Sequence, residues 1–409
     1  MKKYSHVIAY PIRVLLDGLM LVPLAIMCLV SRFFRNKVDI GIGPEPIISH
    51  KYQKKALKTY GYSVETYVNS VYFVTNEFDI RGDLYLPKYG ALLLPYLLFV
   101  RAIFRYKCIY IYFNGGSLFP TIFLWRVEPF LYKMANLRVV VMPYGGDVQE
   151  LSRSNNLMYK AAISKDYPAF RLRRKRIERK IDMWTKHASH VISGCDWVEY
   201  MYHWDTLLLA HFTIDEEQWK PVENTIAKNS RSKPLKVCHA PNHRSIKGTK
   251  YFASVVESLK RDGFNIELII LEKVPNEEIK QMILTADIVA DQLVIGWYGM
   301  FAVEAMALGK PVLCHIRPDF EDFFIYEGLL EPDELPIIKC TYRNLKETLL
   351  KLIENRERLD SIGEKSREFV MKHHSTKSMG ETFDRINRSM GIQPSRNSGL
   401  IFGSDESRQ

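Results

Sequence analysis

The hydrophobic and polar positions along this chain follow two alternating patterns. Short apolar runs, several of which end in glycine or proline, alternate with longer stretches whose apolar positions recur every three or four residues. The runs are typical of buried parallel strands, and the longer stretches are typical of the helices that cover them. The pattern therefore predicts an α/β fold with doubly wound parallel sheets.

The alternation occurs in two series separated by a polar linker. We expect strands near residues 38–44, 108–116, 137–147 and 189–194 in the first series. In the second series we expect strands near 235–241, 265–272, 287–294 and 310–316, with helices at 247–263, 276–286 and 299–309. The sequence thus predicts two Rossmann-like domains, 38–215 and 216–374, that face each other across a cleft. A helix near 375–390 is a candidate to pack back on the first domain, and 391–409 is expected to be a polar tail.

Residues 1–37 form a separate apolar and basic segment. The run "VLLDGLMLVPLAIMCLVSRFF" contains Asp17 and Pro23 and is followed by cations. A bilayer span needs roughly 20 apolar residues, so a single span, an interfacial helix and a covered apolar helix all stay open. We expect membrane attachment at the cytoplasmic face, either peripheral or by one N-terminal span.

The charge balance indicates an anionic partner. The chain has 57 Lys and Arg against 46 Asp and Glu, a net charge of +11. Phosphate, lipid headgroups and nucleic acid all fit this charge. The basic run "RLRRKRIERK" lacks the aromatic platform or helix-turn-helix pattern of nucleic-acid binding, so an anionic membrane surface is the expected second partner and no nucleic acid is expected. The six cysteines show no zinc spacing, and no metal or cofactor is expected.

Two segments of the second series predict a phosphate site. In "HAPNHRSIKGTKYF" a strand ends just before a predicted helix start, with Arg244 and Lys247 beside it. Cations at a helix N-terminus are unfavourable unless an anion docks between them and the backbone amides. In "GWYGMFAVEAMALGKP", Gly296 and Gly299 let the backbone approach a ligand, and Glu304 lies in the apolar helix that follows. Glu304 either accepts from ribose hydroxyls or is a surface residue paired with Lys310 or another cation.

These segments carry a resemblance to a known family. "GMFAVEAMALGKPV" looks like the signature helix of the retaining glycosyltransferases of the GT-B fold, family 4, and "HRSIKG" resembles their donor diphosphate site. "VVMPYGGDV" resembles, more weakly, a segment of the family's N-terminal domain. The resemblance covers roughly residues 38–390.

The resemblance implies roles for particular residues. Glu304 would bind ribose, while Arg244 and Lys247 would stabilise the diphosphate leaving group. Backbone amides at the start of the signature helix would meet the diphosphate or the sugar, and an aspartate and an "NGG" turn of the first domain would lie near sugar and acceptor. The residues concerned are Gly299, Met300, Phe301, Asp147, Asn114, Gly115 and Gly116.

One position departs from the family pattern. The family carries a second glutamate eight positions before the first, which contacts the donor sugar, and Gly296 stands there in this chain. Asp291 or Gln292 is a candidate substitute.

The predicted function is transfer of a sugar from a UDP- or GDP-sugar to a cell-envelope polysaccharide or lipid-linked acceptor, with retention. A nucleotide-sugar epimerase of the same fold and a non-catalytic glycan- or lipid-binding scaffold are the alternatives.

Overall fold

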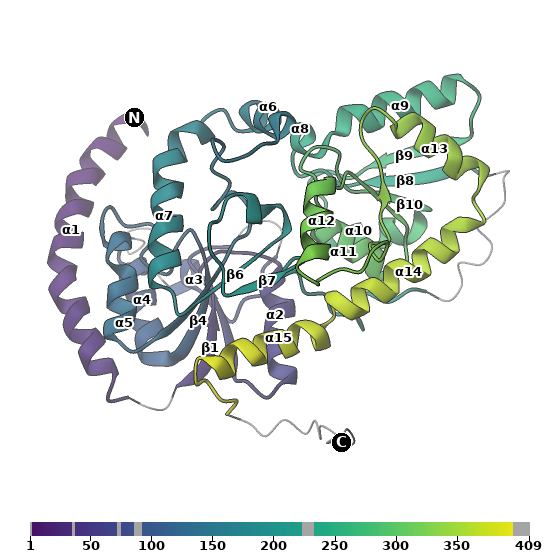
Figure 1. The fold of residues 1–409 in the computed structure, drawn as a ribbon. Helices are drawn as coiled ribbons and strands as arrows, with labels where there is room; N and C mark the ends of the chain where they lie inside the picture. The colour runs from purple at the N-terminus through teal and green to yellow at the C-terminus, as the bar shows by residue number, and fades with distance from the viewer. Residues whose placement is uncertain (1, 35–36, 72–74, 86–91, 223–232, 396–409) are drawn as a thin grey trace, which may run out of the picture. The chain divides into compact units, whose positions relative to one another are not determined.

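The computed structural model of the chain describes residues 2–34, 37–71, 75–85, 92–222 and 233–395 (Figure 1). The middle of the predicted linker and most of the predicted tail 391–409 lie outside these residues. The chain divides into two compact units. The first unit comprises residues 1–142, 182–191 and 376–409, and the second comprises 143–181 and 192–375.

The first sheet is parallel throughout. Among the described residues its strand order is β3-β2-β1-β4-β5-β6-β7, the doubly wound arrangement that the sequence predicted. Its strands are β1 (Val38–Ile42), β2 (Val64–Val68), β3 (Ile80–Arg81), β4 (Tyr106–Tyr112), β5 (Arg138–Met142), β6 (His190–Gly194) and β7 (Thr206–Leu208).

Helices of the first unit cover the strands of this sheet, and the first of these helices is formed by the N-terminal apolar segment. They are α1 (Lys2–Ser31), α2 (Ser49–Thr59), α3 (Gly82–Tyr85), α4 (Leu94–Arg105), η2 (Leu124–Arg126), α5 (Glu128–Met134) and α15 (Thr376–Ser389). α15 packs closely on α2, and a Cβ at Gly380 would lie 2.6 Å from the Tyr60 ring. Within the described residues, α1 contains one stretch, Tyr10–Ser31, that is long and apolar enough to cross a membrane by length and composition.

The second sheet has its own topological switch point. Its described strands run β12-β11-β10-β8-β9, all parallel, so the order reverses between β8 and β10. Ligands of open parallel sheets bind outside the carboxyl ends of the strands at such a point. The strands are β8 (Leu235–His239), β9 (Ile266–Ile270), β10 (Ile288–Ala290), β11 (Val312–Cys314) and β12 (Ile338–Lys339).

Two helices of the second unit, Thr249–Arg261 and Leu345–Glu354, bury an apolar face against this sheet. A core of aliphatic side chains from β8, β10, α9 and α13 includes Leu235, Val256 and Leu349, all buried. The helices are α6 (Leu157–Asp166), η3 (Phe170–Arg173), α7 (Arg174–His187, which enters the first unit at residue 182), η4 (Cys195–Glu199), α8 (Arg244–Lys247), α9 (Thr249–Arg261), α10 (Asn276–Thr285), α11 (Met300–Ala307), α12 (Pro318–Tyr326), α13 (Leu345–Glu354) and α14 (Arg358–His373).

The predicted helix after β8 is in fact two helices. The sequence predicted one helix from about residue 247, but α8 already begins at Arg244 and α9 begins at Thr249. Gly248 separates them in the left-handed conformation, with φ of 77°, which a side-chain-bearing residue adopts at a cost. This break places Arg244 and Lys247 on one short turn at the end of β8.

Candidate functional site

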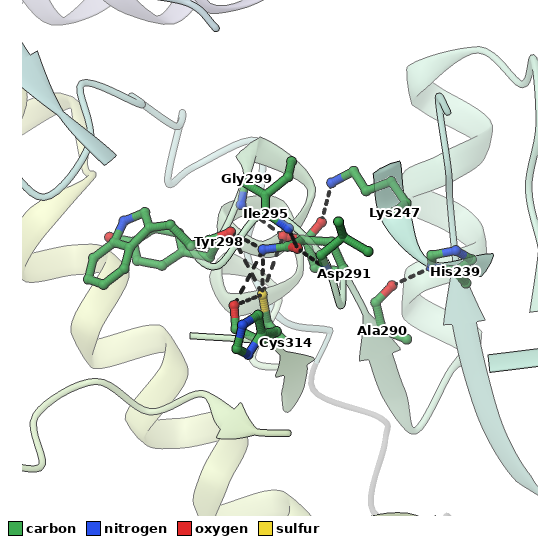
Figure 2. A network of polar contacts seen from close by, with 12 residues as sticks. His239, Lys247, Ala290, Asp291, Ile295, Tyr298, Gly299 and Cys314 are labelled. Carbon is green, nitrogen blue, oxygen red and sulfur yellow. Dashed lines mark hydrogen bonds and ion pairs between the residues drawn. The ribbon is translucent and has the colours of Figure 1, made fainter. Parts of the chain in front are cut away.

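Lys247 and Asp291 form an ion pair at the switch point of the second sheet. Asp291 directly follows β10, and its carboxylate is buried. The Lys247 ammonium lies 2.6 Å from Asp291 Oδ1, and the Gly299 amide donates to Asp291 Oδ2 over 2.8 Å (Figure 2). A buried carboxylate is stable only when charge and hydrogen bonds compensate it. Asp291 therefore fixes both the cation of α8 and the entry into α11.

His239, the last residue of β8, is hydrogen-bonded to the last residue of β10. Its Nδ1 donates to the Ala290 carbonyl over 2.8 Å (Figure 2). Its Nε2 lies 3.0 Å from the Thr249 hydroxyl. Burial lowers the pKa of His239 to about 4, so the ring is neutral at physiological pH and accepts from Thr249. The histidine therefore holds the first turn of α9 against β10.

Arg244 is paired differently from Lys247. Its guanidinium makes a two-bond contact with Glu272, with Nε to Oε1 at 2.7 Å and Nη2 to Oε2 at 2.8 Å. Both side chains are largely exposed. Exposed pairs of this kind contribute little, so an incoming anion can replace Glu272 at small cost. Arg244 is thus the adaptable cation of the site, whereas Lys247 is fixed.

The N-terminus of α8 already has a carboxylate partner. Asp166, the last residue of α6, accepts from the amides of Ser245 and Ile246 at 3.1 and 3.2 Å. The sequence analysis missed Asp166 because it is 79 residues away from the amides it caps. Arg244 also lines a pocket of about 310 Å³ between α6 and α9, together with the cations Lys165 and Lys250.

Glu304 is buried inside α11, with 4% of the residue exposed. The alternative that Glu304 is a surface residue is therefore wrong. The Lys310 ammonium donates to the carbonyls of Leu284 and Ala286 at 3.0 and 2.8 Å. Met300 and Phe301, the first two residues of α11, are partly exposed, and amides in the first turn of a helix have no acceptor within that helix.

The loop that precedes α11 is held from within. The Gln292 side chain accepts from the amides of Val294 and Ile295 at 2.9 and 2.7 Å and donates to the Trp297 carbonyl. Gln292 is therefore committed to its own loop, just as Asp291 is committed to Lys247 and the Gly299 amide.

Gly296 has no room for a side chain. Its φ is 101°, and a Cβ there would lie 2.6 Å from the Cγ and Cδ atoms of Arg317. Arg317 is in turn fixed by an ion pair of 3.0 Å with Glu199. A glutamate at this position of the loop, as in the family that the sequence resembles, would therefore clash with Arg317.

Asp147 lies in a turn of the second unit and stabilises that turn. It is buried, and its Oδ1 accepts from the amides of Tyr144 and Gly145 at 3.0 and 2.9 Å. Nearby in the same unit, Gln149 donates to the carboxylate of Asp196 over 3.1 Å. Burial raises the pKa of Asp196 to about 6, a perturbation that is common at functional sites and that the sequence analysis did not identify.

The "NGG" turn belongs to the first unit. Asn114 donates to Glu45, and Gly115 has a φ of 117°. Glu128, fully buried, accepts from the Gly116 amide at 3.0 Å and so organises the turn. The structure thus brings Lys247, Asp291 and Gly299 together in the second unit, with Arg244 on the same short helix as Lys247 but paired with Glu272. It places Asn114, Gly115 and Gly116 in the first unit.

Comparisons with known proteins relate this fold to glycosyltransferases. No protein-family model matches the chain. An uncharacterised glycosyltransferase of Methanocaldococcus jannaschii is 28% identical over 160 residues, which are 39% of this chain and 34% of that relative. The chain therefore matches about a third of the length of this relative.

Solved structures match over most of the chain. Sucrose-phosphate synthase of Thermosynechococcus elongatus has a TM-score of 0.58 at 13% identity, over 87% of this chain and 99% of that one. The N-terminal domain of trehalose-6-phosphate phosphatase of Candida albicans has a TM-score of 0.52 at 10% identity, over 88% and 97%. The predicted fold class, two Rossmann-like parallel α/β sheets of the GT-B type, is confirmed.

Proposed function

We propose that this protein is a glycosyltransferase that takes a sugar from a UDP- or GDP-sugar and transfers it to a cell-envelope polysaccharide or lipid-linked acceptor. The observation that carries the proposal is the pairing of Lys247 with buried Asp291 at the switch point, beside the amide of Gly299. The archaeal relative, itself named a glycosyltransferase, supports the same activity.

The chemistry follows from the charge of the leaving group. Cleaving a sugar–phosphate bond develops negative charge on the diphosphate, and preorganised cations stabilise that charge most effectively. Lys247 is preorganised because its partner Asp291 is buried and fixed. Arg244 exchanges Glu272 for phosphate oxygens, which match its planar fork in the same two-bond geometry.

Glu304 anchors the nucleotide in this proposal. A carboxylate in a nucleotide crevice accepts hydrogen bonds from ribose hydroxyls, as the acidic residue of dinucleotide-binding folds does. Amides of Gly299, Met300 and Phe301 meet the diphosphate at the start of α11.

The transfer step involves only the acceptor and the departing diphosphate. The acceptor oxygen attacks the anomeric carbon as its bond to the diphosphate breaks, and the departing phosphate takes the acceptor proton on the face from which it leaves, with retention. No protein nucleophile is then needed, and no metal or cofactor enters this mechanism.

Glu304→Gln tests the nucleotide site. The substitution keeps the shape of the buried side chain and removes the charge that accepts from ribose. We expect the Kd for UDP or GDP, measured by calorimetry, to rise by about ten- to a hundredfold, because a lost hydrogen bond to a charged group costs about 1.5–3 kcal/mol. Glu257→Gln, on the exposed face of α9, is the matched control and should bind as the wild type does. Unchanged nucleotide binding by Glu304→Gln would contradict the assignment.

Product analysis separates transferase from the alternatives. A transferase yields an acceptor-linked sugar, whereas an epimerase yields free epimer and nucleotide. A non-catalytic scaffold is favoured by one observation, the closed position at Gly296, and would bind donor without turnover.

A further inference from the structure

The N-terminal helix α1 has two opposite faces of different character. Asp17, Leu24, Cys28 and Ser31 are buried, and their spacing of seven, four and three residues forms one stripe. The opposite face is apolar and open to solvent. Its residues are Leu15, Leu19, Val22, Ile26 and Leu29, each 50–64% exposed. At 3.6 residues per turn these five residues form a second continuous stripe, about half a turn away from the first.

Asp17 fixes the buried face of α1 to the first unit. Its Oδ2 accepts from the amides of Ile122 and Phe123 at 2.9 and 2.8 Å, and the Tyr96 hydroxyl of α4 donates to its Oδ1. A carboxylate in an apolar helix is costly unless it is compensated in this way. The acid that interrupts the apolar run is therefore a specific anchor between α1 and the body of the unit.

Further contacts hold the other end of α1. The Arg32 guanidinium donates to the Met134 carbonyl over 2.7 Å at the end of α5, and Lys37 donates to the Ile103 carbonyl over 2.8 Å in α4. Asp17 and Arg32 are about 22 Å apart along the helix at 1.5 Å per residue. Figure 1 shows α1 as one long helix beside α4 and α5. A helix attached over this length to a polar α/β body cannot have the same stretch surrounded by lipid.

Cations lie where α1 ends. Lys133, Arg138 and Lys186 line a pocket of about 420 Å³ beside the end of α5, next to Met134, whose carbonyl accepts from Arg32. The ring of Phe130, which is half exposed, lies 4.5 Å from the His187 ring. An apolar helix face with basic side chains at one end complements a bilayer whose headgroups are anionic.

We propose that α1 is an in-plane membrane anchor. Its apolar stripe enters the boundary between headgroups and acyl chains of an anionic membrane, while Asp17 keeps the helix on the protein, and the helix does not cross the bilayer. This inference is independent of the proposed glycosyltransferase activity.

Vesicle binding by the full chain tests the surface. We compare phosphatidylcholine vesicles with and without phosphatidylglycerol in flotation assays. The wild type should float with the anionic vesicles, and Leu19→Glu/Val22→Glu, which alters only exposed positions, should weaken binding at least about tenfold. Lys133→Glu/Arg138→Glu should reduce the preference for anionic lipid. Equal binding to both vesicle types would overturn the proposal, and so would self-association of the wild type in place of vesicle binding.

A depth measurement separates an in-plane helix from a spanning one. All six native cysteines are buried, so a fluorophore can be attached selectively to Leu15→Cys or Ile26→Cys. Quenching by lipids that carry quenchers at defined depths should place both labels at the same shallow level. A label at residue 26 near the bilayer centre with residue 15 near a headgroup region would show a spanning helix and refute the proposal.

Discussion

The ion pair between Lys247 and Asp291 gives the sharpest test of the donor site. Replacing Lys247 by methionine keeps most of the stem but leaves the buried carboxylate of Asp291 without its cation, while the Gly299 amide still donates to it. Removing one partner of a buried pair costs about 3–5 kcal/mol. Because 16% of the Lys247 side chain is exposed, we expect a smaller loss, about 2–4 kcal/mol of the free energy of unfolding.

A second substitution separates folding from binding. In Lys247→Met/Asp291→Asn the buried charge is gone, and the asparagine oxygen can still accept from the Gly299 amide. We expect stability to return to within about 1 kcal/mol of the wild type, because replacing both members of a buried pair is nearly neutral. Binding of UDP or GDP should nevertheless remain lost, since the cation that meets the diphosphate is absent.

The assays are urea unfolding, followed by tryptophan fluorescence, and calorimetry with the nucleotides. Lys346→Met is the matched control, because Lys346 forms an equally short pair of 2.6 Å with Asp262 in the same unit but both side chains are nearly half exposed. It should cost less than about 1 kcal/mol. If Lys247→Met were as stable as Lys346→Met, the buried ion pair would not stabilise the fold. If the stable double variant bound nucleotide as the wild type does, Lys247 would not contact the diphosphate.

Two further predictions concern the loop before α11 and the buried acid of η4. Gly296→Ala should lower the free energy of unfolding by about 1–3 kcal/mol, because φ is 101° and the new Cβ displaces Arg317. Gly299→Ala is the control and should cost less than about 1 kcal/mol, because φ at Gly299 is −109° and its new Cβ would have contacts of 3.5 Å or more. Equal losses of stability in urea titrations would contradict this packing. Burial raises the pKa of Asp196 from 3.8 to about 6, so the folded state binds the proton more tightly than the unfolded state does. Proton binding to Asp196 therefore stabilises the fold fully below about pH 4, and this stabilisation is lost as the pH rises through about 6. Asp196→Asn should therefore be more stable than the wild type above pH 6, by on the order of 2–3 kcal/mol, and similar to it near pH 4; a constant difference in the urea midpoint across that range would refute the shift.

Much of the architecture could be predicted from the sequence because it depends on local periodicity. The runs "LKVCHAP" and "DIVADQLV" predict strands that the structure places at β8 and β10, and "GMFAVEAMALG" predicts α11, which begins at Met300. Parallel strands followed by glycine-opened turns then imply a crevice at their carboxyl ends. These features follow from short-range sequence patterns, so the fold class could be predicted from the sequence alone.

The partners of the site residues were not accessible in this way. Asp166 caps α8 across 79 residues of sequence, and Asn156 donates to the carbonyls of Val294 and Ile295 across 138 and 139 residues. These contacts join residues 143–181 to the second unit, and residues 192–215 are joined to it by the Leu209 carbonyl, which accepts from the Trp297 indole, and by the ion pair of Glu199 with Arg317. No periodicity within a segment encodes a partner that far along the chain.

The sequence by itself determined two parallel α/β sheets, a glycine-opened helix with one acid, and an apolar N-terminal segment interrupted by Asp17. Only the tertiary structure decided that Glu304 is buried, that Lys247 is fixed by Asp291, and that Asp17 anchors α1 through amides 105 and 106 residues away. The physical reason is that backbone pattern is set by neighbours in sequence, whereas the burial and compensation of a charge are set by whichever groups the fold brings to it.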